Sequence, residues 1–250
     1  MAQVGPGTFG FLCGLAQREE LPGPVVTRLL QELGLTPAGA RTYLSRMVYS
    51  GDLNSRRAGR HSIYSMTGNY LAEFHRLSIP PVPPQWEGAF HLVLFDIPES
   101  ERPARDALQR AAHAHGFRPL RPGAYVGNRP PGEWLDARAY AGRWSVDNAT
   151  ARRVIAAAWD VDSSAERIRS LAASRGPALA DAALPDAALV AAVTRRHSQL
   201  FVALRHLPPF PVELLPDGYP VDELDAMLDH LLLRELPAAG AAMARLVADV

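Results

Sequence analysis

The sequence has no lysine, and all 26 of its basic residues are arginine. A GC-rich coding bias is the simplest explanation, although the planar guanidinium group also suits contacts with phosphate and guanine. The acidic residues also number 26, which gives a formal net charge of zero. Because nucleic-acid-binding domains are usually basic, the total charge alone argues against such a partner.

Cysteine and long apolar runs are also scarce. Cys13 is the only cysteine, which excludes an intramolecular disulfide and a cysteine metal cluster, and we expect it to be a small core residue. There is no run of about 18 apolar residues and no basic-then-apolar N-terminal signal pattern, so we expect a cytoplasmic protein without a membrane span. With 250 residues, 48% of them hydrophobic, the chain can build one to three folded domains.

The charge is unevenly distributed along the chain. Residues 1–80 hold eight arginines and five acidic residues, an excess of three positive charges. Between Leu33 and Gly68, Asp52 is the only acidic residue. The N-terminal segment is therefore basic, which is compatible with DNA binding even though the net charge of the whole chain is zero.

This basic segment contains a helix with two different faces. Thr36 is a good N-cap and Pro37 suits the first helical position, while Gly51 stops the helix. The stripe predicted to face the core comprises Ala40, Leu44, Met47 and Val48. The opposite, polar side holds Ala38, Thr42, Ser45, Arg46 and Tyr49, with Arg41 on its flank.

A second helix and a hairpin flank this helix. The preceding helix runs from about Val25 to Leu33 and ends at Gly34, which leaves a tight turn. After Gly51, two short strand candidates cover residues 53–56 and 60–66, joined by Arg57-Ala58-Gly59. This order predicts a winged helix-turn-helix, in which a helix enters the major groove and a basic hairpin lies on the neighbouring phosphates.

The residues predicted to contact DNA are Thr36, Arg41, Thr42, Ser45, Arg46, Tyr49, Arg56, Arg57, Arg60 and His61. The first six belong to the helix and the last four to the hairpin. The alternative is that the polar helix face and the basic hairpin are only solvated surface, as charge clusters often are.

We predict an α+β protein of three domains. A winged helix-turn-helix covers residues 1–79, and a proline-rich linker covers residues 80–86, where four prolines exclude a helix or a central strand. A ferredoxin-like domain covers residues 87–162, and a helical domain covers residues 163–250.

The ferredoxin-like prediction depends on a β-α-β-β-α-β order of elements. Strands are expected at 90–97, 117–120, 124–126 and 153–161, and helices at about 100–116 and 133–140. The alanine-rich stretch 155–159 is also compatible with a helix. In the last third, helices are expected from about 163, from Asp186 and over 221–236, with a proline-rich loop at 208–220 that could shape a binding face or a subunit interface.

Three blocks resemble the PaaX-type family of bacterial repressors. They are GLTPAGARTYLSRMVYSGDLNSRRAGRHSIYSMT, FDIPESERPARDALQRAAHAHGFRPLRPGAYVG and FPVELLPDGYP, and they occur in the order expected for the family. The resemblance implies a homodimeric transcriptional repressor that binds a palindromic operator in double-stranded DNA. It also implies release by an acyl-CoA inducer, typically phenylacetyl-CoA, and thus a link to phenylacetate catabolism.

The family's C-terminal loop usually begins Asp-Pro-x-Leu-Pro, and Leu207-Pro208-Pro209-Phe210-Pro211 replaces it here. The ligand residues therefore do not transfer one by one. If an acyl-CoA binds, its phosphates need cations, and the nearest candidates are Arg118, Arg121, Arg152 and Arg153. Solvated surface arginines are the alternative for these four.

The sequence is compatible with two further functions. The middle block also resembles a small CRISPR-associated ferredoxin-fold nuclease, in which an Asp at the end of the first strand binds a metal across a dimer, and Asp96 occupies this place. A lone Asp is a weak metal signal, and capping of the next turn is its simpler role. A non-DNA interaction module is the other alternative. Motifs for a catalytic site, a metal or a cofactor are missing, so we expect a protein that is not an enzyme.

Overall fold

The computed structural model describes residues 4–77, 86–135 and 137–250. The chain divides into two compact units: the first comprises Met1–Pro81, Ser170–Arg205 and Asp222–Val250, and the second comprises Val82–Arg169 and His206–Val221. Most helices of the predicted C-terminal domain thus belong to the first unit, because they pack on its N-terminal helices, whereas residues 163–169 and 206–221 belong to the second unit. Residues 80–85 of the predicted linker lie outside the described residues.

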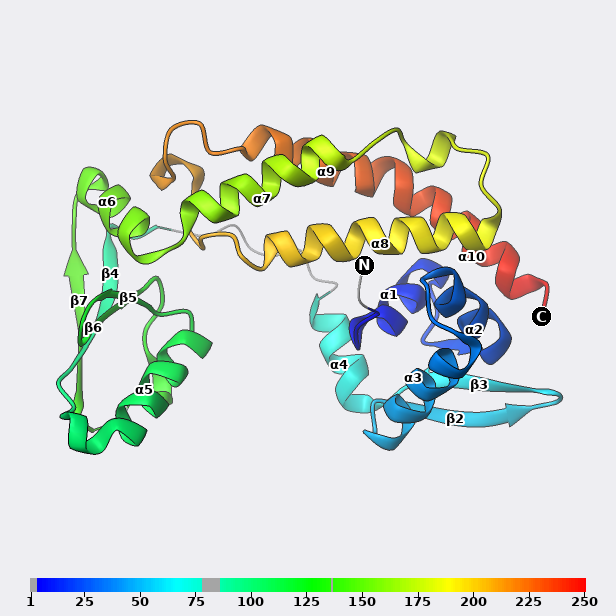
Figure 1. The fold of residues 1–250 in the computed structure, drawn as a ribbon, viewed down its shortest axis with the longest axis horizontal. Helices are drawn as coiled ribbons and strands as arrows, with labels where there is room; N and C mark the ends of the chain where they lie inside the picture. The colour runs from blue at the N-terminus through cyan, green and yellow to red at the C-terminus, as the bar shows by residue number, and fades with distance from the viewer. Residues whose placement is uncertain (1–3, 78–85, 136) are drawn as a thin grey trace. The chain divides into compact units, whose positions relative to one another are not determined.

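The N-terminal part of the first unit holds a helix pair followed by an antiparallel hairpin (Figure 1). The short strand β1 pairs with β3, which completes a three-stranded sheet of order β1-β3-β2. The sequence did not predict β1 because three residues carry no periodicity. The elements are α1 (Gly7–Ala16), β1 (Glu20–Pro22), α2 (Gly23–Glu32), α3 (Pro37–Tyr49), β2 (Leu53–Ala58), β3 (His61–Met66) and α4 (Gly68–Leu77).

The buried stripe of α3 differs by one residue from the predicted stripe. Tyr43 is 5% exposed, whereas Val48, predicted to face the core, is 36% exposed. Ala40, Tyr43, Leu44 and Met47 follow the i, i+3, i+4, i+7 spacing of a helix face, and Val48 falls beyond its edge. The Tyr43 hydroxyl donates a hydrogen bond to the carbonyl of Gly5 at 3.1 Å, which satisfies the polar end of this buried ring.

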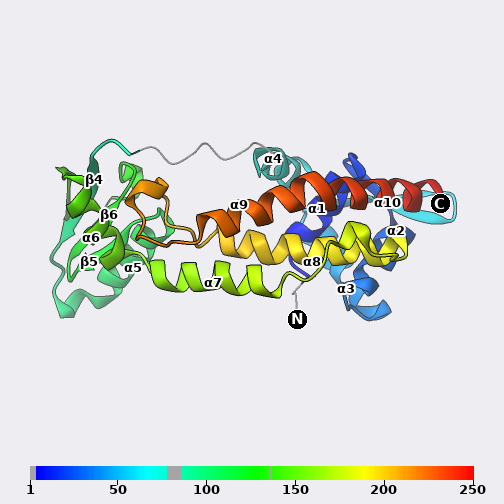
Figure 2. The same ribbon diagram turned by 90° about the horizontal axis from the view of Figure 1, so that it is seen from above.

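Long helices complete the first unit. They are α8 (Asp186–Leu204), α9 (Val221–His230), the π-helical turn η5 (Leu231–Glu235) and α10 (Leu236–Ala248), together with the last turn of α7 (Val161–Ser174), whose residues up to Arg169 belong to the second unit. Helices α8 and α10 lie side by side and antiparallel (Figure 2), and they pack on α1 and α2. Asp186 at the start of α8 accepts two hydrogen bonds from Arg245 of α10, at 2.6 and 2.9 Å.

The second unit contains a four-stranded antiparallel sheet of order β5-β6-β4-β7. This is the strand order of a ferredoxin-like sheet, but a single 3-10 turn stands between β6 and β7 where that fold has its second helix. The elements are β4 (Ala89–Phe95), η1 (Glu99–Glu101), α5 (Arg102–Ala114), β5 (Arg118–Arg121), β6 (Ala124–Gly127), η2 (Gly132–Trp134), β7 (Ala139–Ser145), α6 (Asn148–Ala158) and η4 (Val212–Leu214).

Two predicted elements of this unit are wrong. Residues 153–158 of the strand expected at 153–161 are instead the end of α6, and Val161 begins α7. Asp147 caps α6 by accepting the Thr150 N–H at 2.6 Å, and alanine favours helix. The helix expected at 133–140 shrinks to η2, and the fourth strand is β7. The α+β class is confirmed, with two small antiparallel sheets and a helical C-terminal part.

Apolar side chains cover both faces of the four-stranded sheet. Val93 and Phe95 of β4 pack with Leu108 of α5 on one face. On the other face, the core includes Phe90, Trp159 and, from the proline-rich loop, Phe210, and Trp86 packs edge-on against Phe90 with ring centroids 4.8 Å apart. Trp86, which the predicted linker includes, therefore anchors the second unit, and the proline-rich loop contributes to its core. None of the described helices is long and apolar enough to cross a membrane.

Candidate nucleic-acid interface

The face of α3 opposite the core has no carboxylate, and its side chains are exposed to solvent. Arg41, Thr42, Ser45 and Arg46 are exposed, and Tyr49 keeps 94% of its surface exposed. Helical spacing places Thr42, Ser45, Arg46 and Tyr49 on neighbouring turns of one face. The side chains combine short hydroxyl groups, guanidinium groups and one aromatic ring, which are suited to base edges and phosphates in a major groove.

Thr36 has a structural role at the start of this helix. Its hydroxyl oxygen accepts the N–H of Gly39 at 3.0 Å, and Pro37 follows at the first helical position, as predicted. The turn before it depends on Gly34, whose φ of +101° is accessible to glycine. The capped turn fixes where α3 begins relative to α2, and this positions the exposed face.

The hairpin presents basic side chains close to its tip. Strand β2 extends to Ala58, which pairs with His61, so the connection is Gly59-Arg60 rather than the predicted residues 57–59. Gly59 has a φ of +59°, as the first central residue of a type II′ turn requires. Arg56, Arg57, Arg60 and His61 are all exposed.

Most of this positive charge has no acidic partner. Arg56 forms an ion pair with Glu20 of β1 at 2.8 Å, with both side chains about half exposed, and exposed pairs of this kind contribute little to stability. Among the described residues, no carboxylate pairs with Arg41, Arg46, Arg57 or Arg60. The nearby Asp52 carboxylate accepts instead from the Ser50 hydroxyl at 2.6 Å. The surface is thus a cationic patch available to an anionic partner. Sequence reasoning missed Glu20, since it lies on the short strand β1.

The four arginines predicted to hold an acyl-CoA are each engaged with local acceptors. Arg118 donates to the carbonyls of His113 and Phe117, and Arg121 donates to the carbonyl of Leu120. The other two lie on α6: Arg152 donates twice to the carbonyl of Glu213, and Arg153 donates to the Thr150 hydroxyl. No described contact joins them into one site, so their role as effector ligands stays a prediction.

Asp96 lies directly after β4 and is exposed. Among the described residues, it has no hydrogen bond or ion pair, including the capping bond expected for it. Within the same described part of the chain, no group of three or more His, Cys, Asp or Glu side chains is placed to hold a metal ion. The geometry therefore offers no specific support for the nuclease alternative.

Comparisons with known proteins agree with this arrangement. A model described as "PaaX-like protein" matches residues 19–70, and one described as "PaaX protein central Cas2-like domain" matches residues 83–152. The solved structure of the uncharacterized protein Rv0674 from Mycobacterium tuberculosis shares the fold, with a TM-score of 0.58 and 24% identity over 96% of this chain and 95% of that chain. A search of curated proteins found no match. These two matches, over residues 19–70 and 83–152, support membership of the PaaX-like proteins.

Proposed function

We propose that this protein is a transcription regulator, a repressor of the PaaX type that binds double-stranded DNA through its N-terminal helices and hairpin. The observation that carries the proposal is the carboxylate-free, exposed face of α3, followed directly by an arginine-rich hairpin. Membership of the PaaX-like proteins supports it. The proposal assigns no catalytic residue.

The exposed residues divide into two classes of contact. Ser45 and Arg46 are in the middle of the exposed face of α3, where side chains reach base edges if the helix enters the major groove. Arg57 and Arg60 lie at the hairpin, where a positive charge meets phosphate oxygens and adds affinity for any sequence. The first class gives sequence preference and the second gives general affinity.

The proposal includes regulation of DNA binding by an inducer. Two copies of the chain bind the two halves of a palindromic operator, and an inducer such as an aryl-acetyl-CoA favours a conformation whose half-site spacing does not fit that operator. The inducer then lowers occupancy by as much as its affinities for the two conformations differ.

The two contact classes are tested with single substitutions. Operator DNA is selected from a random pool with the wild-type protein, and binding is measured for Arg46→Ala and Arg57→Ala on selected and scrambled DNA. Arg46→Ala should lose about 1 to 3 kcal/mol on the selected sequence and relax the preference at one position. Arg57→Ala should weaken both DNAs equally and reduce the salt slope by about one.

Arg110→Ala is the matched control, since Arg110 is an exposed arginine on α5 in the second unit. It should bind like the wild type. Equal losses for Arg46→Ala on selected and scrambled DNA would show that α3 does not read the sequence. Failure of the random pool to yield any enriched sequence would count against a sequence-specific regulator.

A further inference from the structure

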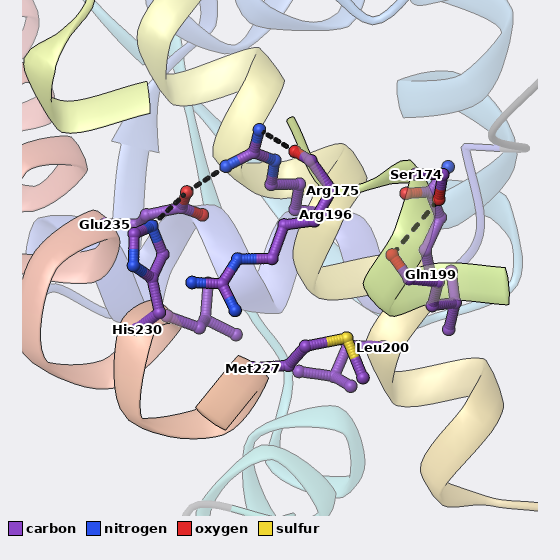
Figure 3. Close-up of a pocket in the computed structure, with 10 residues that line it drawn as sticks. Ser174, Arg175, Arg196, Gln199, Leu200, Met227, His230 and Glu235 are labelled. Carbon is purple, nitrogen blue, oxygen red and sulfur yellow. Dashed lines mark hydrogen bonds and ion pairs between the residues drawn. The ribbon is translucent and has the colours of Figure 1, made fainter. Parts of the chain in front are cut away.

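A cavity of about 70 Å³ that is partly open to solvent lies in the first unit, lined by α7, α8, α9 and the π-helical turn η5 (Figure 3). A cavity several times larger than one water molecule can hold a small organic group. Its polar lining includes Arg175, Arg196, His230 and Glu235, and its apolar lining includes Leu200 and Met227. Figure 3 shows Leu200 and Met227 together, below the guanidinium groups.

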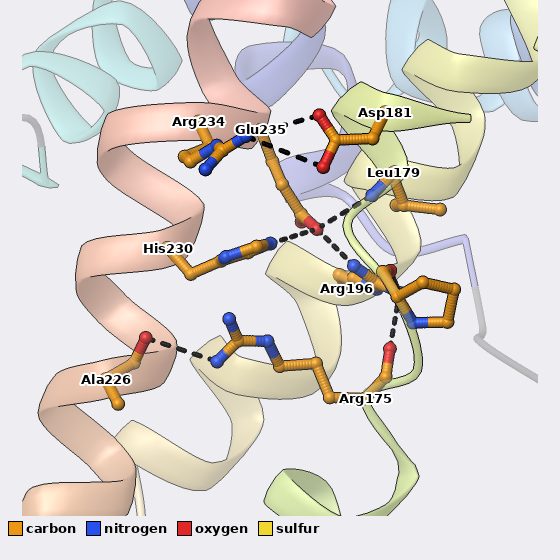
Figure 4. Close-up of polar contacts among 9 residues, drawn as sticks. Arg175, Leu179, Asp181, Arg196, Ala226, His230, Arg234 and Glu235 are labelled. Carbon is orange, nitrogen blue, oxygen red and sulfur yellow. Dashed lines mark hydrogen bonds and ion pairs between the residues drawn. The ribbon is translucent and has the colours of Figure 1, made fainter. Parts of the chain in front are cut away.

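Glu235 neutralises Arg196 at this cavity. The Glu235 side chain is 2% exposed, and one of its oxygens accepts from Arg196, from His230 at 3.2 Å and from the N–H of Leu179 at 3.5 Å. Arg196 also donates to the carbonyls of Arg175 and Pro177 (Figure 4). The charges of the buried carboxylate and the partly buried guanidinium thus balance each other.

Arg175 is the cation left without such a partner. Its guanidinium donates one hydrogen bond, to the neutral carbonyl of Ala226 at 3.2 Å (Figure 4). Among the described residues it pairs with no carboxylate. A guanidinium has five N–H donors in a planar fork that matches a carboxylate. The cavity therefore has one uncompensated positive charge beside an apolar wall.

We infer that this cavity binds a small organic monoanion, a carboxylate with a short apolar group, and that Arg175 holds the carboxylate. The apolar group lies against Leu200 and Met227. The regulatory role of this site rests on the proposed function: the small acid is an effector of DNA binding with its own site in the first unit, distinct in chemical class from the acyl-CoA inducer.

Three consecutive residues of α8 connect the cavity with the N-terminal helices. Arg196 holds the carbonyl of Arg175, as described. Arg195 donates to the carbonyl of Glu32 at the end of α2, at 2.9 Å, and the His197 ring stacks on Phe11 of α1 with centroids 3.9 Å apart. A ligand that binds Arg175 and shifts its backbone changes the hydrogen bond between the Arg175 carbonyl and Arg196. The turn of α8 that holds Arg196 also contacts α1 and α2, the two helices that precede α3.

Binding is measured by calorimetry on the full chain, with benzoate and hexanoate as probes and benzamide and hexanamide as neutral controls. We expect the acids to bind and the amides to bind at least about tenfold more weakly, because a neutral amide lacks the ionised oxygens that form a charge-assisted pair with Arg175. Arg175→Gln should weaken the acids by a similar factor. Arg234→Gln is the matched control, since Arg234 is exposed, pairs with Asp181 at 3.2 Å and is not among the lining residues.

Gln199→Trp provides a second variant in case Arg175→Gln does not fold. Gln199 is exposed and lines the cavity, so a large side chain there should block binding without entering the core. Acids that bind equally to the wild type and to both variants would overturn the proposal. Binding of phenylacetyl-CoA but of neither acid would also overturn it, since the cavity would then not recognise a small carboxylate.

The link to DNA is tested separately from binding. In the wild type, benzoate or hexanoate should weaken DNA binding by at least threefold, and Arg195→Gln should bind the acid normally while losing most of this response. Acid binding with no DNA affinity in any variant would contradict the proposed function and leave the site standing. DNA affinity with no acid binding would remove the site and leave the proposed function standing.

Discussion

His197 lies between two aromatic rings, those of Phe11 at 3.9 Å and Phe201 at 6.0 Å. Burial lowers its pKa from 6.5 to about 4. The folded protein therefore keeps the ring neutral at a pH where the unfolded chain already binds a proton. The free energy of unfolding must fall as the pH decreases from about 6.5 to about 4.

This residue gives the first prediction on stability. Between pH 7 and pH 5 the wild type should lose about 2 kcal/mol more than His197→Phe, which keeps the stacked ring but cannot be protonated. Urea unfolding of both proteins, followed by circular dichroism, measures the difference, and all other titrating groups cancel in it. Identical pH profiles for the two proteins would show that His197 does not titrate as its burial requires.

At the residue scale, the sequence predicted which side chains of α3 face solvent but not all that face the core. The cap at Thr36 and the polar face followed from local chemistry, which a helix satisfies within one or two turns. Tyr43, and not Val48, is buried in the core because its hydroxyl donates a hydrogen bond to the carbonyl of Gly5, which is far away in the chain. The Arg196 cluster was not predicted from the sequence, although the polar run 194–199 inside an apolar helix marks its place.

At the scale of elements, the turn between β5 and β6 depends on Gly123. Its φ is +72°, its carbonyl accepts the N–H of Phe95 at 2.9 Å, and a Cβ atom there would lie 2.5 Å from the carbonyl oxygen of Phe95. A left-handed conformation costs an alanine about 1 kcal/mol, and the clash with backbone adds to it.

Gly123→Ala should therefore destabilise the second unit by at least about 2 kcal/mol. Gly142→Ala on the edge strand β7 is the control, because a Cβ there would meet nothing within 4 Å and alanine reduces the flexibility of the unfolded chain. Denaturant midpoints of the two variants measure the contrast. Equal midpoints would contradict the described turn.

Two elements were mispredicted because contacts with residues outside them determine their structure. Residues 153–161 contain apolar side chains at spacings that fit both a strand and a helix, and the deciding contact is the Asp147 cap several residues earlier. Strand β7 is largely exposed, and its polar and apolar residues do not alternate regularly. Neither its composition nor a two-residue period therefore predicts a strand. Its seven-residue pairing with β4 supplies the backbone hydrogen bonds that local sequence cannot reveal.

At the scale of the molecule, periodicity predicted helices in the last third but not their partners. An amphipathic helix specifies that one face is buried, and any complementary apolar surface can cover it. Here α8 and α10 pack on α1 and α2, so the C-terminal helices join the N-terminal unit. In the same way the loop 206–221 joins the second unit, where Phe210 and Leu214 are buried.

This arrangement places the cavity and the helices proposed to bind DNA in the same compact unit. The helices that precede α3 are supported by the helix that lines the cavity, within one compact unit. A ligand needs only to favour one of two arrangements of this unit to change DNA affinity.

The most direct test of the central claim is binding of the purified chain to the DNA upstream of its own gene. A gel shift at 50 and 200 mM salt, with excess unrelated competitor, separates specific from general affinity. We predict a complex that survives the competitor and weakens at least about tenfold at the higher salt, since several arginines displace counterions from phosphates. A fragment that binds no better than the competitor, at either salt concentration, would contradict the proposed function.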